Sequence, residues 1–310
     1  MLYHVLHSTL YDYAMPVQLA HHLLHLVPRH CPWQRIEAHA LRVDPAPTSH
    51  LEVSDAFGNP VSCIELAVPH DHLHVESEIS LRVAPRPWLG KLDDQDRWED
   101  VTTLLCYQAR PLSDELVEAE RMRFESPGVR VKRELEEYAA PSFSAKRPLV
   151  DATLNLMARI HDEFHYDPEA TEVGTTVLEV LERKSGVCQD FAHLMVGCLR
   201  SMGLAARYVS GYLRTDPPAG QPRMLGADAS HAWVAVYVPA HGWIEFDPTN
   251  NCLADERHLV IGWGRDFVDV SPIRGVIQGG GEHTLKVGVT VTPVDEEEGD
   301  RLVQPSAEVS

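Results

Sequence analysis

Residues 183–202, RKSGVCQDFAHLMVGCLRSM, are the segment around which we expect the rest of the chain to be arranged. Ser185 and Gly186 interrupt one apolar-periodic run, and a new run begins at Cys188. The apolar residues of this new run recur at helical spacing, and they are Phe191, Leu194, Met195, Cys198 and Leu199. Gly203 follows, at a place where helices often end in a left-handed residue. The pattern predicts a buried central helix whose first turn contains Cys188.

The position of Cys188 has a chemical consequence. The first turn of a helix has unpaired N–H groups and the positive end of the helix dipole, and both favour a thiolate over a thiol. A free cysteine is nevertheless commonly an inert buried residue, which is our interpretation of Cys198. The hypothesis that Cys188 is a nucleophile therefore depends on finding a base for it.

The composition excludes some functions. The chain has 310 residues, 44% hydrophobic and 24% charged, with a net charge of −19. These are ordinary globular values, and the negative charge disfavours binding to nucleic acid, which needs clustered Lys and Arg. Part of the charge lies in residues 295–310, DEEEGDRLVQPSAEVS, which we interpret as an acidic disordered tail.

Cysteine usage and the chain ends point to a compartment. No run of about 18 apolar residues is present, so we expect no membrane contact. The first residues, MLYHVLHSTLYDY, lack the features of a signal peptide. The six cysteines form no CxxC or Cys/His cluster, so we expect no metal and no cofactor. Free thiols in a reducing, cytoplasmic location are the expectation.

Changes of period along the chain divide it into four parts. Residues 1–85 are rich in alternating and β-branched segments and predict a β-rich, sandwich-like N-terminal module. Residues 86–147 predict a linker with short helices, and residues 148–294 predict a core of helices and strands. The tail occupies 295–310. The overall prediction is an α+β fold in which the Cys188 helix packs on an antiparallel sheet, with the N-terminal module packed against this core.

A hairpin supplies the base that Cys188 needs. Residues 231–238 and 243–247 alternate as two strands around a turn at 239–242, with His231 starting the first and Asp247 ending the second. Both residues then lie near the same end of adjacent strands. A cysteine becomes an acyl-transfer nucleophile when a histidine holds its proton and a third group fixes the imidazole. Considered without His231, Asp247 would be interpreted as a turn residue, because an Asp–Pro pair is a common turn signal.

Three blocks resemble one family. They are SGVCQDFAHLMVGCLRSMGLAARYVSGYL (185–213), DASHAWVAVYVPAHGWIEFDPTN (228–250) and HLVIGWGRDFVDVSPIRGV (258–276). The chain resembles the transglutaminase-like superfamily of papain-like fold, in its bacterial branch, and HHLLHLVPRHCPWQRIEAHALRVDPAP (21–47) is similar to the N-terminal module of that branch. The resemblance implies that Cys188 is the nucleophile, His231 the base and acid, and Asp247 the residue that orients His231.

The resemblance implies a reaction class and leaves the acceptor open. An acyl-enzyme on Cys188 is released by water in a cysteine protease or amidase, or by an amine in a transglutaminase. The chain has no DxDxDG calcium loop of the kind expected for calcium-dependent members, so we favour hydrolysis of a peptide or protein amide. A non-catalytic binding or scaffold protein on the same fold is the alternative from another class. The sequence does not predict an oligomeric state.

Other residues near Cys188 receive weaker assignments. The backbone N–H of Cys188 is the natural first oxyanion donor, and Tyr166 or Gln189 could supply a second. We expect Asp190 and His193 to be structural, because they lie about 160° and 140° around the helix from Cys188. Trp233 and Trp243 are expected to pack in the core. The loop at 216–229 precedes His231 and is a candidate lid.

Overall fold

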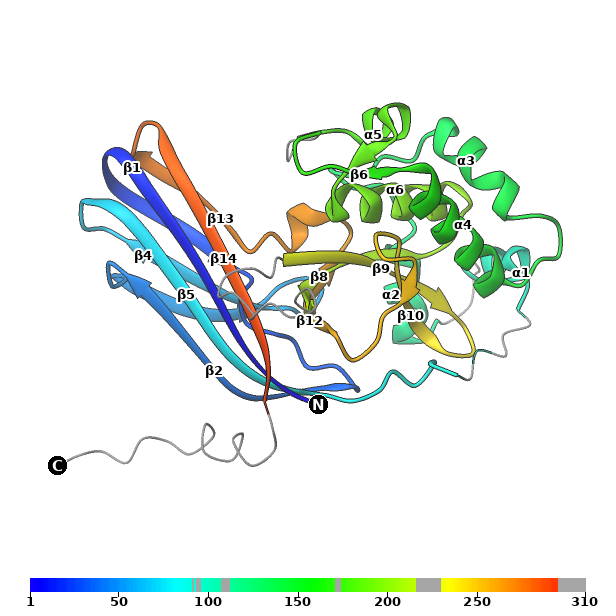
Figure 1. Cartoon of the computed structure of the whole chain (residues 1–310), viewed down its shortest axis with the longest axis horizontal. Coiled ribbons are helices and arrows are strands. Elements are labelled where there is room, and N and C mark those ends of the chain that lie inside the picture. Colours follow the sequence, from blue (N-terminus) through cyan, green and yellow to red (C-terminus); the bar gives the residue numbers. More distant parts are fainter. Residues whose placement is uncertain (91, 93–95, 107–111, 171–173, 216–229, 295–310) are drawn as a thin grey trace, which may run out of the picture.

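The computed structural model describes residues 1–90, 92, 96–106, 112–170, 174–215 and 230–294. The expected acidic tail (295–310) and the expected lid (216–229) lie outside the described residues. Helices, a five-stranded sheet and a two-stranded sheet form one half of the molecule, and a curled antiparallel sheet forms the other (Figure 1).

The curled sheet has seven strands and is built around β1 (Leu2–Leu24). Four further strands of this sheet are β2 (Gln34–Asp44), β3 (Ser49–Ser54), β4 (Pro60–Leu66) and β5 (His70–Val83). The strand order is β2-β5-β1-β4-β3, so β5 and β4 lie on either side of β1. The first half of β1 pairs with β5, and its second half pairs with β4. The pairing with β5 shifts in register between Asp12 and Val17, and β4 is the partner from Ala20 onward. One strand therefore joins the parts of a sheet that curls on itself.

Alternation along β5 explains how this sheet buries one face. Apolar side chains on one side of β5 are fully buried, and they are Leu73, Val75, Ile79, Leu81 and Val83. The intervening polar side chains remain partly accessible. This alternation is that of a half-buried antiparallel strand, as expected in the β-rich part at residues 1–85.

Two late strands complete the curled sheet, which corrects the predicted extent of the core. The predicted core of residues 148–294 includes the strand at residues 284–292. The structure instead pairs β14 (His283–Val294) with the first half of β1, and β13 (Ile273–Gly279) with its second half. A period-two pattern identifies a strand but not its partner, because register and partner are set by distant residues. The other predicted boundaries stay predictions.

Helices cover the second half of the molecule. They are α1 (Trp98–Leu104), α2 (Asp114–Arg121), α3 (Arg133–Ala139), α4 (Leu149–Glu163), α5 (Val177–Arg183) and α6 (Cys188–Ser201), with short 3₁₀ turns η1 (Ala140–Ser142) and η2 (Phe267–Asp269). Among the described residues, no helix is both long and apolar enough to cross a bilayer. Helix α6 begins at Cys188, as predicted.

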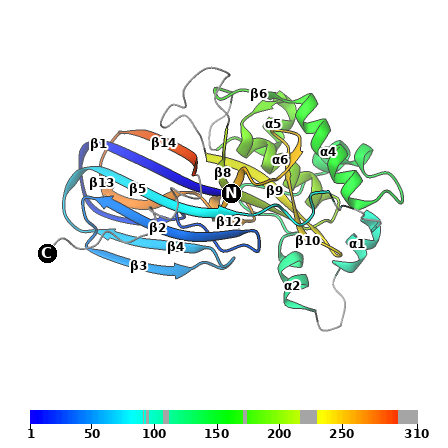
Figure 2. The ribbon, with the colours of Figure 1, turned by 60° about the horizontal axis from the view of Figure 1, so that its bottom comes forward.

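A five-stranded antiparallel sheet supports α6. The strand order is β11-β10-β9-β8-β12, formed by β8 (Ala206–Leu213), β9 (Ser230–Val238), β10 (Gly242–Asp247), β11 (Cys252–Leu253) and β12 (His258–Gly264). Nearly all of α6 from Asp190 to Arg200 is buried, because it lies between this sheet and the other helices (Figure 2). The predicted helix on an antiparallel sheet is confirmed.

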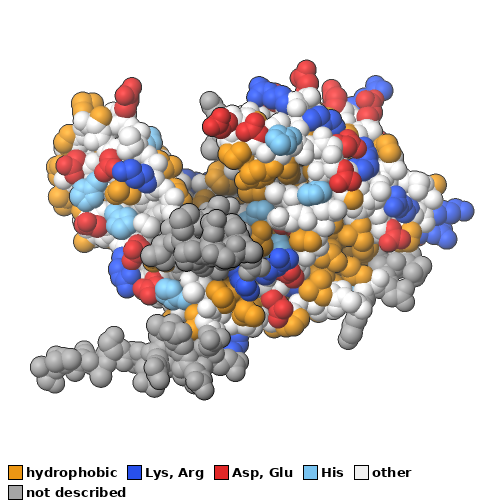
Figure 3. Space-filling view, viewed as in Figure 1, with side chains coloured by type: hydrophobic (Ala, Val, Ile, Leu, Met, Phe, Trp, Pro, Cys, Tyr) orange, Lys and Arg blue, Asp and Glu red, His pale blue; other side chains and the backbone are white. Residues whose placement is uncertain are grey.

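The two halves meet at β8 and β12. Tyr212 and Leu259 join a buried cluster with Tyr3, Leu81 and Val291 of the curled sheet. A notch separates other parts of the two halves (Figure 3). The predicted packing of the N-terminal module on the core is therefore confirmed.

Two side-chain amides extend this junction along the free edge of β12. The Gln34 amide donates to the carbonyl of Val260 at 2.7 Å and accepts from its N–H at 2.9 Å. In the same way, the Asn59 amide donates to the carbonyl of Trp263 at 2.8 Å and accepts from the N–H of Trp263 at 3.0 Å. The curled sheet thus supplies the partners that an edge strand otherwise lacks.

We expect Gln34→Leu to lower the free energy of unfolding by about 2–3 kcal/mol, because it leaves a buried N–H and a buried C=O of Val260 unpaired. Urea denaturation measures this change. The matched control is Gln18→Leu, at an exposed position of β1, which should stay within about 0.5 kcal/mol of wild type. Equal effects of the two substitutions would contradict the role assigned to Gln34.

Candidate active site

The backbone around Cys188 is fixed by a short parallel strand pair. Strand β7 (Ser185–Gly186) pairs with β6 (His165–Tyr166), and this places Tyr166 beside Gly186. Asp190 then caps α6, since its carboxylate accepts from the N–H of Val187 at 2.8 Å. A Cβ at Gly186 would lie 2.8 Å from the Asp190 side chain, so this close approach requires glycine. The half-buried Cys188 is thereby held at the first position of the helix.

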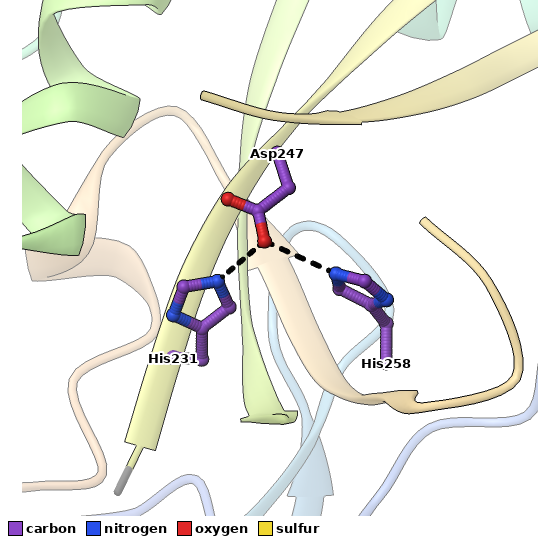
Figure 4. A group of neighbouring side chains, drawn as sticks. All are labelled: His231, Asp247 and His258. Atoms are coloured by element: carbon purple, nitrogen blue, oxygen red, sulfur yellow. Dashed lines mark hydrogen bonds and ion pairs between the residues drawn. The ribbon is translucent and has the colours of Figure 1, made fainter. Parts of the chain in front are cut away.

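The hairpin of β9 and β10 brings His231 and Asp247 together. The last paired residues of the two strands are Phe246 and Val234, so Asp247 lies just beyond the paired part of the hairpin. From there its side chain extends toward His231, at the start of β9. The distance from Nε2 of His231 to Oδ2 of Asp247 is 2.8 Å (Figure 4). Asp247 is fully buried, and His231 is 9% exposed. The predicted proximity of the two side chains is confirmed.

The carboxylate of Asp247 is saturated with donors. Its Oδ1 accepts from the backbone N–H groups of Thr249 and Asn250, at 2.9 and 3.2 Å. Its Oδ2 accepts from the Asn250 amide at 2.7 Å and lies 3.1 Å from Nε2 of His258. Although burial disfavours the charge, the hydrogen bonds from His231 and His258 hold the pKa of Asp247 well below its usual range.

His231 links Asp247 to Cys188. Since Nε2 of His231 faces the carboxylate, Nδ1 is the ring nitrogen left for the thiol. Burial disfavours the imidazolium, but the hydrogen bond to Asp247 and the nearby Cys188 outweigh burial and raise the pKa of His231 to about 9. A protonated imidazole beside a thiol at a helix start is the arrangement that stabilises a thiolate.

The raised pKa of His231 predicts how stability changes with pH. A group whose pKa rises on folding stabilises the native state fully below its unfolded pKa, and this contribution is lost as pH rises through the folded value. For His231 these limits are 6.5 and about 9. We expect the free energy of unfolding to fall between pH 6.5 and 9, and to fall less steeply in His231→Gln. Urea denaturation at several pH values measures this, and parallel curves for the two proteins would contradict it.

The remaining predicted residues lie around this centre in different ways. Tyr166 is half exposed, its ring packs against Phe191, and burial together with the charge of Cys188 raises the pKa of its phenol. Gln189 lines a separate cavity together with His193. Tyr166 therefore lies on the strand pair that directly precedes Cys188, whereas Gln189 faces a different cavity.

The residues that the sequence predicts to be structural make packing or hydrogen-bond contacts. Nε2 of His193 accepts from the backbone N–H of Phe267 at 3.0 Å. Cys198 is completely buried, and Trp233 and Trp243 lie in the same core. Asp190 is the helix cap described above.

Three residues of the site were not singled out from the sequence. They are His258, Asn250 and Tyr208. The first begins the block HLVIGWGRDF and the second ends the block FDPTN, so both lay within the segments that carried the resemblance. Tyr208 is buried on β8, where burial and then the charge of Cys188 raise the pKa of its phenol. No periodicity could indicate its proximity to Cys188, because the two belong to different elements.

The ring nitrogens of His231 and His258 and a carboxylate oxygen of Asp247 lie within 4.8 Å of one another. Oδ2 of Asp247 is already occupied by three hydrogen bonds. The geometry is therefore that of a hydrogen-bonded network, and we assign no metal to it.

Comparisons with known proteins identify the family of the chain. The model of the transglutaminase-like superfamily matches residues 136–248, and that of the bacterial transglutaminase-like N-terminal region matches residues 3–87. An uncharacterized protein of Mycobacterium tuberculosis is 40% identical over 307 residues, which cover 97% of this chain and 94% of the relative. The chain therefore belongs to the transglutaminase-like superfamily. It combines the superfamily core with the bacterial N-terminal region.

More distant relatives include one enzyme and one solved structure. A protein-glutamine gamma-glutamyltransferase of Pseudomonas aeruginosa is 28% identical over 191 residues, which are 59% of this chain and 25% of that protein. The crystal structure of a candidate cysteine protease from Cytophaga hutchinsonii superimposes with a TM-score of 0.71 at 18% identity. It covers 95% of this chain and 92% of the other, and so confirms the fold.

Proposed function

We propose that this protein is a cysteine acyl-transfer enzyme that cleaves an amide bond through a thioester on Cys188. The observation that carries the proposal is the His231–Asp247 hydrogen bond beside Cys188, which is near enough to His231 to help raise the pKa of its imidazole. Its three members come from a helix start and two adjacent strands, and His231 is the one group in contact with both others.

Acylation follows from this arrangement. The Cys188 thiolate attacks the carbonyl carbon of the amide, and the carbonyl π electrons move to oxygen. His231 gives its Nδ1 proton to the amide nitrogen as the C–N bond breaks, so a neutral amine leaves. Asp247 keeps the proton on Nε2 and stabilises the imidazolium before this transfer.

Deacylation reverses the proton movements. Neutral His231 removes a proton from water, and the hydroxide adds to the thioester carbon. The C–S bond then breaks, which regenerates the thiolate–imidazolium pair and releases a carboxylic acid. The net reaction is an amide plus water giving an acid plus an amine. We favour water over an amine as acceptor, and analysis of products formed with and without added amines separates hydrolysis from transamidation.

The developing oxyanion needs donors. The backbone N–H of Cys188 lies in the first turn of α6, where N–H groups have no intrahelical acceptor. We assign the second donor to the Tyr166 hydroxyl, because Tyr166 pairs with Gly186 just before the nucleophile and its phenol senses the charge of Cys188.

The deciding experiment is the pH dependence of iodoacetamide alkylation at Cys188, located by mass spectrometry. We expect wild-type thiol to react well below pH 7 and this low-pH reactivity to disappear in His231→Ala. A thiol that reacts only above about pH 8 in both proteins would contradict the proposal and favour a binding or scaffold protein. The first result justifies a screen of peptide and glutamine amides as substrates.

The expected compartment and partners are part of this proposal. All six cysteines are free thiols in the structure, which suits the proposed cytoplasmic location. Cell fractionation of the producing organism tests this location, and recovery of the protein outside the cytoplasm would overturn it.

A further inference from the structure

A second histidine contacts the carboxylate that orients His231. His258 begins β12 and is completely buried. Its Nε2 lies 3.1 Å from Oδ2 of Asp247, the same oxygen that accepts from His231 (Figure 4). The two imidazole rings are 6.2 Å apart between centroids. The mechanism proposed above makes no use of His258.

The other side of this ring also faces a carboxylate. Nδ1 of His258 lies 3.1 Å from Oδ1 of Asp255, and the backbone N–H of Asp255 points at the same nitrogen, also at 3.1 Å. A neutral ring that donates from Nε2 would accept the Asp255 backbone N–H at Nδ1, but it would also present the Nδ1 lone pair to a negative carboxylate oxygen. An imidazolium instead donates to both carboxylates, and charge-assisted hydrogen bonds of this kind are the stronger ones. The flanking carboxylates therefore favour a charged His258.

The pKa of His258 agrees with this geometry. Burial disfavours the charged ring, but hydrogen bonds to Asp247, Asp255 and Cys252 outweigh burial and raise the pKa of His258 to about 10. Asp255 is also held by Arg257, at 2.8 Å. The positive charge of His258 is thus balanced by Asp247 at one ring nitrogen and by Asp255 at the other.

The curled sheet holds the strand that carries His258. The guanidinium of Arg86, just beyond β5, donates to the His258 carbonyl at 2.7 Å. Gln34 and Asn59 fix the next residues of β12 through Val260 and Trp263. The position of the His258 ring relative to Asp247 therefore depends on contacts from the N-terminal module.

We propose that His258 is a positioning residue: a buried imidazolium, held in place through β12 by the N-terminal module, that shares Oδ2 of Asp247 with His231. The inference rests on the proposed function, because it concerns the same Cys188–His231 pair. In this arrangement His258 offsets the negative charge of Asp247 and sets the pH range over which the thiolate–imidazolium pair exists.

Charged and titratable groups face His258 from several elements. They are Asp247 on β10, Cys252 on β11, His231 on β9, Asp255 in the preceding loop, and the Arg86–Glu245 pair behind the His258 carbonyl. His258 is the cation that lies on the opposite side of Asp247 from the Cys188–His231 pair. Its removal leaves the site more negative, and a more negative site binds protons more tightly.

The test is His258→Gln, which keeps an N–H donor but removes the charge. We expect both ionisations of the Cys188–His231 pair to move to higher pH, by about half a unit or more. Iodoacetamide, a neutral reagent, reports the thiol ionisation. Iodoacetate, an anion, reports the imidazolium, because its reaction is assisted by the positive charge of His231.

The matched control is His7→Gln. His7 is also buried and hydrogen bonded, to Tyr212 and Thr9, but burial lowers the pKa of His7 to about 4, so its replacement removes no charge at neutral pH. We expect this variant to lose stability and to keep both ionisations of the pair. A folded His258→Gln whose ionisations coincide with those of wild type would overturn the inference.

A measurement on the wild-type protein covers the case in which His258→Gln does not fold. In ¹⁵N-histidine-labelled protein at pH 8, we expect an imidazolium that persists after Cys188 is alkylated, in addition to the one whose titration responds to alkylation. If only the responsive imidazolium exists, the inference is wrong while the proposed function stands. If wild-type Cys188 lacks reactivity below pH 7, it is the proposed function that fails.

Discussion

Replacing Cys188 with alanine is expected to abolish thiol-directed labelling at this position and to reduce turnover by at least about 1,000-fold, because no other group can form the thioester. The fold should survive. Cys188 is half buried at the start of α6, so its replacement creates no cavity in the core. Circular dichroism and thermal unfolding check the fold, and product formation from the substrate found in the screen checks turnover. Undiminished turnover would end the assignment of Cys188 as nucleophile.

Cys198 provides the matched control for this variant. It lies on the same helix but is completely buried in the core, where burial raises the pKa of its thiol to about 12. We expect Cys198→Ala to lower the free energy of unfolding by about 1–2 kcal/mol through lost packing. Labelling at Cys188 should be unchanged. The two variants thus separate chemistry from stability at two thiols of one helix.

The sequence predicted the parts of the site that depend on local pattern. The break before Cys188 placed the start of α6, and the alternation of residues 231–247 placed His231 and Asp247 at one end of a hairpin. Both inferences need only periodicity and turn chemistry, which are set by neighbouring residues.

The sequence could not predict features that depend on distant contacts. β14 has the pattern of any half-buried strand, and its place beside β1 follows from burial of Val289 and Val291 against Tyr3 and Val5. His258 was missed for a related reason. It precedes an apolar strand, where a histidine is ordinarily a strand-end residue, and its contact with Asp247 arises only when β12 and β10 are placed in one sheet.

Replacing Asp247 with asparagine tests the orienting group and is expected to have the second large effect. The carboxylate accepts from two backbone N–H groups on one oxygen and from three side-chain N–H groups on the other. An asparagine offers one acceptor oxygen and one NH₂ donor. If the oxygen keeps the backbone donors, the NH₂ group faces Nε2 of His231 and can be accommodated only if the proton on that ring moves to Nδ1.

A His231 ring protonated on Nδ1 and neutral can no longer take a proton from Cys188. We therefore expect turnover in Asp247→Asn to fall by about 1,000- to 10,000-fold. The pH midpoint of Cys188 alkylation should rise toward that of an ordinary thiol, about 8.5. Slow or absent alkylation below pH 7, measured by mass spectrometry, tests the second statement without a known substrate. Turnover is measured with the substrate found in the screen.

The control for Asp247→Asn is Glu245→Gln. Glu245 is also a fully buried carboxylate on β10, two residues away, but its Oε2 contacts Trp233 and Arg86 rather than His231. Loss of this charge should cost stability while Cys188 remains reactive below pH 7. If both variants shift the alkylation midpoint equally, then buried negative charge in general, and not the contact between Asp247 and His231, supports the thiolate. If only Asp247→Asn shifts it, the proton held on Nε2 of His231 is what makes Cys188 a nucleophile.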